Sequence, residues 1–215
     1  NLYGFVALTA IGTLQVLMPT VTNHSDPEAG VRLRRDLKWA FTGSLLLAVG
    51  QAADQLWLAG SGAALWGWVL TRMLHAWMGL YGWRLLSLHG NAPPLFAATL
   101  GLAAAMLDSL RLETAAGPLA IFLPGFLMPL VSGAASQLAP VWLQPGRREA
   151  WHDQSIRALG RWGGVRALLF LSAAVLPLAG YRCAGMPALT ALFWFGIQFV
   201  VWLLGSEPAG QTKKV

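Results

Sequence analysis

The sequence alternates long apolar runs with short polar loops, and this pattern restricts the folds that the chain can adopt. Several runs reach about 20 residues, the length that an α-helix needs to cross the hydrocarbon core of a bilayer. Hydrophobic residues make up 56% of the 215 residues and charged residues only 11%, whereas soluble domains carry about 25% charged residues. We therefore predict an all-α, polytopic integral membrane protein.

Breaks in the apolar pattern predict about seven transmembrane helices. Glycine and proline interrupt the pattern, as at a tight turn expected over 60–62 and a longer break over 89–94. The helices are expected to form one transmembrane domain over 1–215, whose last part, 206–215, is a polar cytoplasmic tail. The predicted helices cover 2–18, 37–59, 63–88, 95–110, 119–143, 165–178 and 187–204.

The first apolar run returns as a weaker copy in the second half of the chain. Each matched residue lies 121 positions after its counterpart. This constant offset predicts two degenerate repeats, the first over about 1–115 and the second over about 119–205. The matched residues are Gly4, Phe5, Gly12 and Pro19 in the first copy and Gly125, Phe126, Gly133 and Pro140 in the second.

Most positive charges fall in loops that seven crossings would place on one side. The loops 19–36, 89–94 and 144–164 share that side with the tail, whereas the other side has only Arg111 and Arg182. Cytoplasmic loops are enriched in Lys and Arg, which predicts a bacterial inner-membrane protein with a periplasmic start and a cytoplasmic C-terminus. Charges confined to loops also argue against nucleic-acid binding. The side with most of the positive charges holds Arg32, Arg34, Arg35, Arg147, Arg148, Arg157, Arg161, Lys213 and Lys214.

Three polar residues fall inside the second and third predicted helices: Asp54, Arg72 and His75. An ionisable residue in a membrane span usually faces the protein interior and has a partner or a function. The tight turn makes these helices antiparallel neighbours, and a rise of ~1.5 Å per residue puts Asp54 and Arg72 at similar depth. We predict a buried Asp54–Arg72 pair, either as a structural lock or as part of a proton or substrate path.

His75 and His89 are candidate cofactor ligands. On one continuous helix their spacing brings both side chains onto nearly one face, ~21 Å apart along the axis. Imidazole is an axial ligand of haem, so the pair predicts binding of haem b or copper. An internal hydrogen-bonding role for His75 is the alternative. His24 and His152 are expected in cytoplasmic loops.

The first apolar run resembles a repeat element of the haem-copper oxidase catalytic subunit, especially in cbb-type enzymes and nitric oxide reductases. In that family a helix enters from the periplasmic side after a His-x-His pair and carries Gly-Trp or Gly-Phe, a later glycine and a final proline. Gly4, Phe5, Gly12 and Pro19 match this pattern. The resemblance extends to NnrS-like polytopic proteins. It implies repeated helix groups, association with haem b or copper, and a place as subunit or accessory of a respiratory membrane complex.

The family's catalytic residues do not carry over to this chain. Its ligating histidines would lie upstream of Asn1, where we expect further residues, and the corresponding segment 115–124 has no histidine. Enzymatic activity is therefore left open. One alternative is a small-molecule or ion transporter, because broken repeated helices are common in transporters. Another is a structural subunit of a larger membrane assembly, in which Gly79 and Gly82 permit close helix packing. The expected partners are the lipid bilayer and other membrane subunits.

Overall fold

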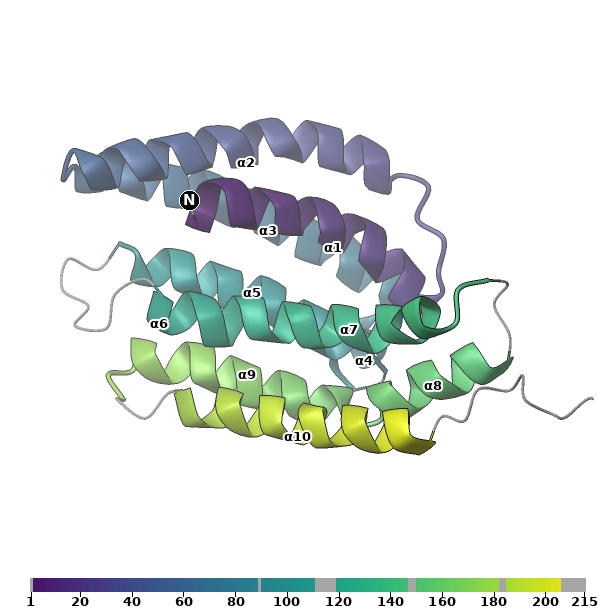
Figure 1. Ribbon diagram of the computed structural model, residues 1–215. Helices are drawn as coiled ribbons and strands as arrows, with labels where there is room; N and C mark the ends of the chain where they lie inside the picture. Colours follow the sequence, from purple (N-terminus) through teal and green to yellow (C-terminus); the bar gives the residue numbers. More distant parts are fainter. Residues whose placement is uncertain (1, 89, 111–118, 147–149, 182–184, 206–215) are drawn as a thin grey trace, which may run out of the picture.

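The computed structural model describes residues 2–88, 90–110, 119–146, 150–181 and 185–205, and all regular structure within them is helical. The predicted all-α class is therefore confirmed. The helices lie side by side in three layers, α1 to α3, α5 to α7, and α8 to α10 (Figure 1). Their bounds are η1 Leu2–Val6, α1 Ala7–Thr22, α2 Ala29–Ala52, α3 Leu56–Tyr81, α4 Trp83–Ser87, α5 Ala92–Asp108, α6 Leu119–Ile121, η2 Phe122–Leu127, α7 Met128–Leu143, α8 Ala150–Gly160, α9 Gly163–Leu178 and α10 Gly185–Gly205.

Within the described ranges, three continuous helical segments are long and apolar enough to cross a membrane. They are Leu2–Thr22, Leu119–Leu143 and Gly185–Gly205, and a fourth crossing arises if α8 and α9, which meet at 41°, count as one broken span. These segments identify the chain as a membrane protein. Fewer helices meet this test than the seven predicted, partly because α5, although apolar, has only 17 residues.

The second and third helices lie earlier in the chain than the predicted 37–59 and 63–88. The turn between them contains Asp54 at φ 52°, a left-handed conformation that aspartate tolerates better than most residues. The expected turn glycines instead lie inside α3. A Cβ on Gly62 would be 2.5 Å from the Gly43 carbonyl oxygen of α2, so this glycine serves close helix packing rather than a turn.

The third helix ends before the predicted boundary at residue 88. Gly82 has φ 75° and ψ 153°, and this conformation stops α3 at Tyr81. The short helix α4 follows. His75 and His89 therefore do not share one continuous helix, and His89 lies outside the described residues, as does the predicted tail 206–215. The predicted loop 144–164 also contains a helix, α8, that the apolar pattern did not indicate because its sequence is largely polar.

Aromatic side chains fill the core between the first two layers. Trp66 and Trp77 of α3 are fully buried, as is Phe126 of η2. The ring of Tyr3 meets that of Phe122 edge to face at 5.8 Å, a favourable arrangement for aromatic pairs. These contacts tie η1, α3 and η2 into one apolar cluster that also includes α5.

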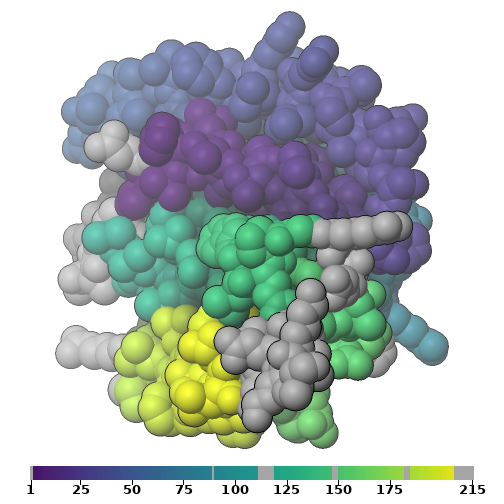
Figure 2. Space-filling model, turned by 45° about the vertical axis from the view of Figure 1, so that its right-hand side comes forward, coloured from purple at the N-terminus to yellow at the C-terminus, as the bar shows by residue number. Residues whose placement is uncertain are grey.

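Helix α10 is attached to the rest of the molecule by a much smaller apolar cluster. Ala188 and Ala191 pack against Phe170 and Ala173 of α9. Only 17% of the most apolar stretch of α10 is buried, and the helix lies at the surface (yellow in Figure 2). Its outward apolar side chains therefore face lipid or another protein.

Candidate functional site

The two charged residues predicted to pair do not meet. Asp54 is exposed in the turn between α2 and α3, whereas the Arg72 guanidinium lies 3.5 Å from the carboxylate of Asp36. The Asp54–Arg72 prediction is therefore wrong, because α2 is shifted along the chain and brings Asp36 beside the second half of α3. The Asp36 side chain is only 4% exposed and also contacts Arg35 Nε at 3.4 Å. Asp36 thus joins α2 to α3 by a buried ion pair.

The described histidines are spread over the molecule. His75 is exposed on α3, whereas a ring nitrogen of His24 lies 2.7 Å from a backbone carbonyl oxygen and one of His152 lies 2.9 Å from another. Within the described residues, no three His, Cys, Asp or Glu side chains are grouped as metal ligands. The described donors thus do not complete a bis-histidine haem site or a copper site, and we assign no reaction step to such a group.

A second buried carboxylate, in the α1–α2 connection, forms an ion pair with α2 and a hydrogen bond with α3. The carboxylate of Asp26 contacts the guanidinium of Arg32 and accepts a hydrogen bond from the hydroxyl of Tyr81 at 3.5 Å. The Asp26 side chain is 2% exposed. Like Asp36, it is a buried carboxylate whose partners come from more than one segment of the chain.

Side chains from α9, α10 and the α4–α5 connection donate hydrogen bonds to backbone carbonyls near the end of α8. The last four carbonyls of a helix have no partner within it, and α8 stops at its bend into α9. In a membrane each such carbonyl must find another donor. We call this group the α8 cap site. Two of its bonds reach these last carbonyls, from Arg166 Nη2 of α9 to Leu159 O (2.9 Å) and from Gln198 Nε2 of α10 to Ala158 O (2.5 Å). The third runs from Asn91 Nδ2 of the α4–α5 connection to Ile156 O (3.5 Å), the carbonyl just before them.

Arg166 is the central residue of the α8 cap site. It is fully buried, its Nη1 and Nη2 atoms lie 3.4 and 3.3 Å from Ser136 Oγ of α7, and its guanidinium stands 4.5 Å from the Phe195 ring of α10. No carboxylate among the described residues pairs with it. A cation near a helix C-terminus is stabilised by the helix dipole. One side chain therefore holds four helices together.

The bend between α8 and α9 packs directly on the backbone that enters α5. A Cβ on Gly160 would lie 2.7 Å from Asn91 Oδ1, and one on Gly163 would collide with the carbonyl oxygen of Gly90. Asn91 is 2% exposed and its Nδ2 lies 3.5 Å from Gln137 Oε1. Glycine at these two positions allows the close approach that brings the three capping side chains to α8.

Asp36, Asn91 and Arg166 were not predicted from the sequence as functional residues. Asp36 and Asn91 were assigned to loops, and Arg166 was placed in the first turn of a predicted helix, where arginine usually reaches the membrane surface. A usable signal was the polar stretch 150–160, whose amphipathic pattern predicts a helix that needs caps at its end.

These contacts define a helical membrane protein whose interior charged and amide side chains join helices to one another. In comparisons with known proteins, no family model matches the chain, and no curated protein or solved structure is similar to it.

Proposed function

We propose that the protein is an integral membrane protein with a haem-copper-oxidase-like or NnrS-like arrangement of two related helix units, and that it serves as a subunit or accessory of a respiratory membrane complex. The observation that carries the proposal is the similarity of the two helical segments that begin each unit. The resemblance of the first segment to the oxidase repeat element is the reason for proposing a respiratory complex.

The two segments share their local structure at the constant offset of 121 residues. Ala7–Thr22 and Met128–Leu143 are both helices of 16 residues, and each is preceded by a π-helical turn. Each helix contains a proline near its end, Pro19 or Pro140, and the residue after the helix donates its N–H to the carbonyl of that proline. A π-helical turn is uncommon, so its recurrence at matching positions favours two repeats of one ancestral unit.

We further propose seven crossings, by α1, α2, α3, α5, α7, α9 and α10. Their connections alternate between the two ends of the bundle, with α4, α8 and the α1–α2 connection at one end (Figure 1). This end, here the basic end, carries most of the described arginines, and the positive-inside rule favours a cytoplasmic position for it in a bacterial inner membrane. The basic end includes Arg32, Arg34, Arg35, Arg157 and Arg161.

The polar interior favours a subunit over the alternative of a transporter. Asp36, Asp26 and Arg166 each connect neighbouring helices or loops and so act as fixed contacts. The outward apolar face of α10 suits a helix that packs against lipid or another subunit. A transporter would use such polar residues to line a path that opens and closes.

Haem or copper association is the part of the proposal that depends on His75. His75 and Gly79 lie one turn apart on the exposed side of α3, and nothing lies within 4 Å of the position of a Gly79 Cβ. This face has room for a flat group that takes one ligand from His75 and the other from a residue outside the described chain.

Extraction of the tagged protein from its native membranes in a mild detergent tests the proposal. We expect the protein to migrate with partner chains in a band whose reduced-minus-oxidised spectrum shows a b-type haem, or which contains copper. His75→Ala should remove the metal signal due to this chain while leaving the complex assembled, and His24→Ala is the matched control. Migration as a single free chain without haem or copper would contradict the proposal.

A further inference from the structure

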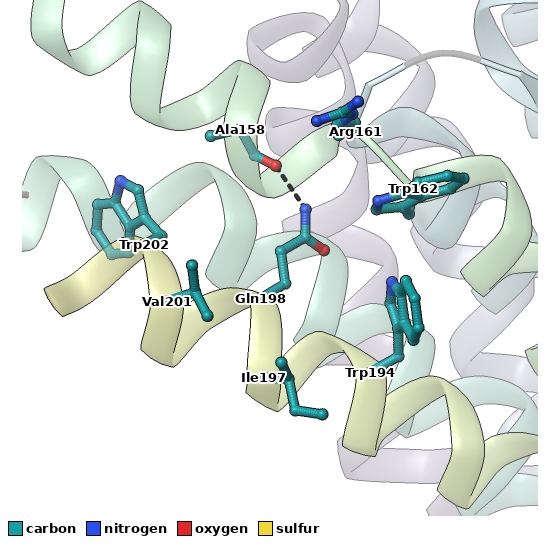
Figure 3. A pocket seen from close by; sticks show the side chains of 8 residues that line it. All are labelled: Ala158, Arg161, Trp162, Trp194, Ile197, Gln198, Val201 and Trp202. Atoms are coloured by element: carbon teal, nitrogen blue, oxygen red, sulfur yellow. Dashed lines mark hydrogen bonds between the residues drawn. The ribbon is translucent and has the colours of Figure 1, made fainter. Parts of the chain in front are cut away.

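A groove opens between α8 and α10 on the outer side of the α8 cap site. Its volume is about 350 Å³. Figure 3 shows Gln198 reaching from α10 toward α8, with Trp202 on one side and Trp162 and Trp194 on the other. The lining residues are Ala158, Arg161, Trp162, Trp194, Ile197, Gln198, Val201 and Trp202.

The wall of the groove formed at the α8–α9 bend carries one exposed cation beside indole rings. The Arg161 guanidinium lies 5.9 Å from the centre of the Trp162 ring, which meets the Trp194 ring edge to face at 6.0 Å. Arginine and tryptophan are the residue types that gather at the boundary between headgroups and acyl chains. The groove therefore presents a positive charge at the depth where a lipid carries its phosphate.

Among the described residues, no hydrogen-bond partner is found for two buried polar atoms of the side chains that line the groove. Gln198 donates its Nε2 to Ala158 O, but its Oε1 is buried without a donor, and the Nε1 of Trp202 is buried without an acceptor. Buried polar atoms usually have partners. The Gln198 oxygen lies at the groove wall and lacks a donor, which a ligand hydroxyl can supply.

Next to the groove, the outward face of α10 has a shallow apolar depression. It also measures about 350 Å³, and it shares Ile197 and Val201 with the groove. Gly196 forms part of its floor, and nothing lies within 4 Å of the position of a Gly196 Cβ. A groove with a positive charge thus adjoins an apolar helix face, which is the order of headgroup and chain in an amphiphile. The depression is lined by Phe193, Gly196, Ile197, Val200 and Val201.

We propose that this groove binds one anionic phospholipid of the phosphatidylglycerol type. Arg161 pairs with the phosphate, and Gln198 Oε1 accepts a hydrogen bond from a glycerol hydroxyl. One acyl chain lies against Ile197, Val201 and the depression around Gly196. A zwitterionic phosphatidylcholine fills the apolar part equally well but offers Arg161 no net charge and has no free glycerol hydroxyl.

Native mass spectrometry of the purified full chain tests this inference, with dioleoylphosphatidylglycerol and dioleoylphosphatidylcholine titrated separately. We expect one phosphatidylglycerol to bind more tightly than phosphatidylcholine. Arg161→Gln should weaken phosphatidylglycerol binding about five-fold, the effect of one basic residue at a membrane surface, and phosphatidylcholine binding less, because the choline cation offsets the charge of that lipid's phosphate. Gly196→Leu should weaken binding of both lipids, because the leucine side chain fills the apolar depression.

Arg157→Gln is the matched control, since Arg157 is exposed on α8 one turn earlier and does not line the groove. It should leave binding of both lipids unchanged. Equal binding of the two lipids by the unaltered chain, or equal weakening by Arg157→Gln and Arg161→Gln, overturns the proposal. Displacement of the bound lipid by millimolar glycerol phosphate also overturns it, because the site would then recognise a free phosphate rather than a lipid.

Discussion

Replacement of Arg166 by alanine is expected to lower the free energy of unfolding by about 3 kcal/mol. Two effects act in the same direction. The truncation leaves a cavity where a fully buried side chain stood, and it removes the donor that Leu159 O uses at the end of α8. An unsatisfied carbonyl in an apolar environment is costly. The change is measured by reversible unfolding of the purified protein in dodecylmaltoside with increasing SDS.

Two further variants separate the causes of the Arg166→Ala effect. Arg166→Met refills most of the volume without restoring the hydrogen bond, so its unfolding midpoint should lie between those of Arg166→Ala and the unaltered chain. Arg157→Ala removes an exposed arginine of α8 and should leave the midpoint unchanged. If Arg166→Ala unfolded at the same SDS fraction as Arg157→Ala, Arg166 would not be the contact that holds the four helices.

Asp36→Asn is the second large effect that we expect, a loss of about 2 kcal/mol of unfolding free energy. The substitution keeps the shape of the side chain but leaves the guanidinium of Arg72 without its carboxylate partner. The loss is smaller than for a fully buried pair because the Arg72 side chain is 25% exposed and water screens it partly. SDS titration again measures the change.

Asp54→Asn provides a matched control for the same chemical change. Asp54 is exposed, and asparagine accepts its left-handed backbone conformation as well as aspartate does, so the unfolding midpoint should not move. Arg72→Gln in the Asp36→Asn background should recover part of the stability, since no unpaired charge then remains. If Asp36→Asn and Asp54→Asn lowered the unfolding midpoint equally, the result would contradict the Asp36–Arg72 pair and favour the Asp54–Arg72 pair predicted from the sequence.

The fold class and most helices followed from the apolar runs, because a membrane-spanning helix is defined by composition and length alone. The segment predicted over 119–143 has the same bounds in the structure. The boundaries of α2 and α3 did not follow, because charged residues extend α2 into the expected loop. Gly60 and Gly62 were taken as turn residues, although Gly62 is a packing residue against Gly43.

The polar contacts were harder to predict than the helices. Pairing Asp54 with Arg72 assumed the wrong boundary between α2 and α3, and a shift of two turns of helix changed the partner to Asp36. The α8 cap site depends on a bend between α8 and α9 that brings Asn91 and Gln198 to the same helix end. Such contacts between distant segments have no pattern in a single sequence.

The membrane topology of the bundle is the most direct test of the account. Single cysteines are introduced in a Cys183→Ser background at exposed positions of both ends, and right-side-out vesicles are treated with a membrane-impermeant maleimide. We predict that Asp54→Cys and Tyr181→Cys react in intact vesicles, whereas Asn23→Cys and Pro145→Cys react only after permeabilisation. Reaction of all four cysteines in intact vesicles, or of the basic-end pair alone, would contradict a seven-crossing bundle with a cytoplasmic basic end.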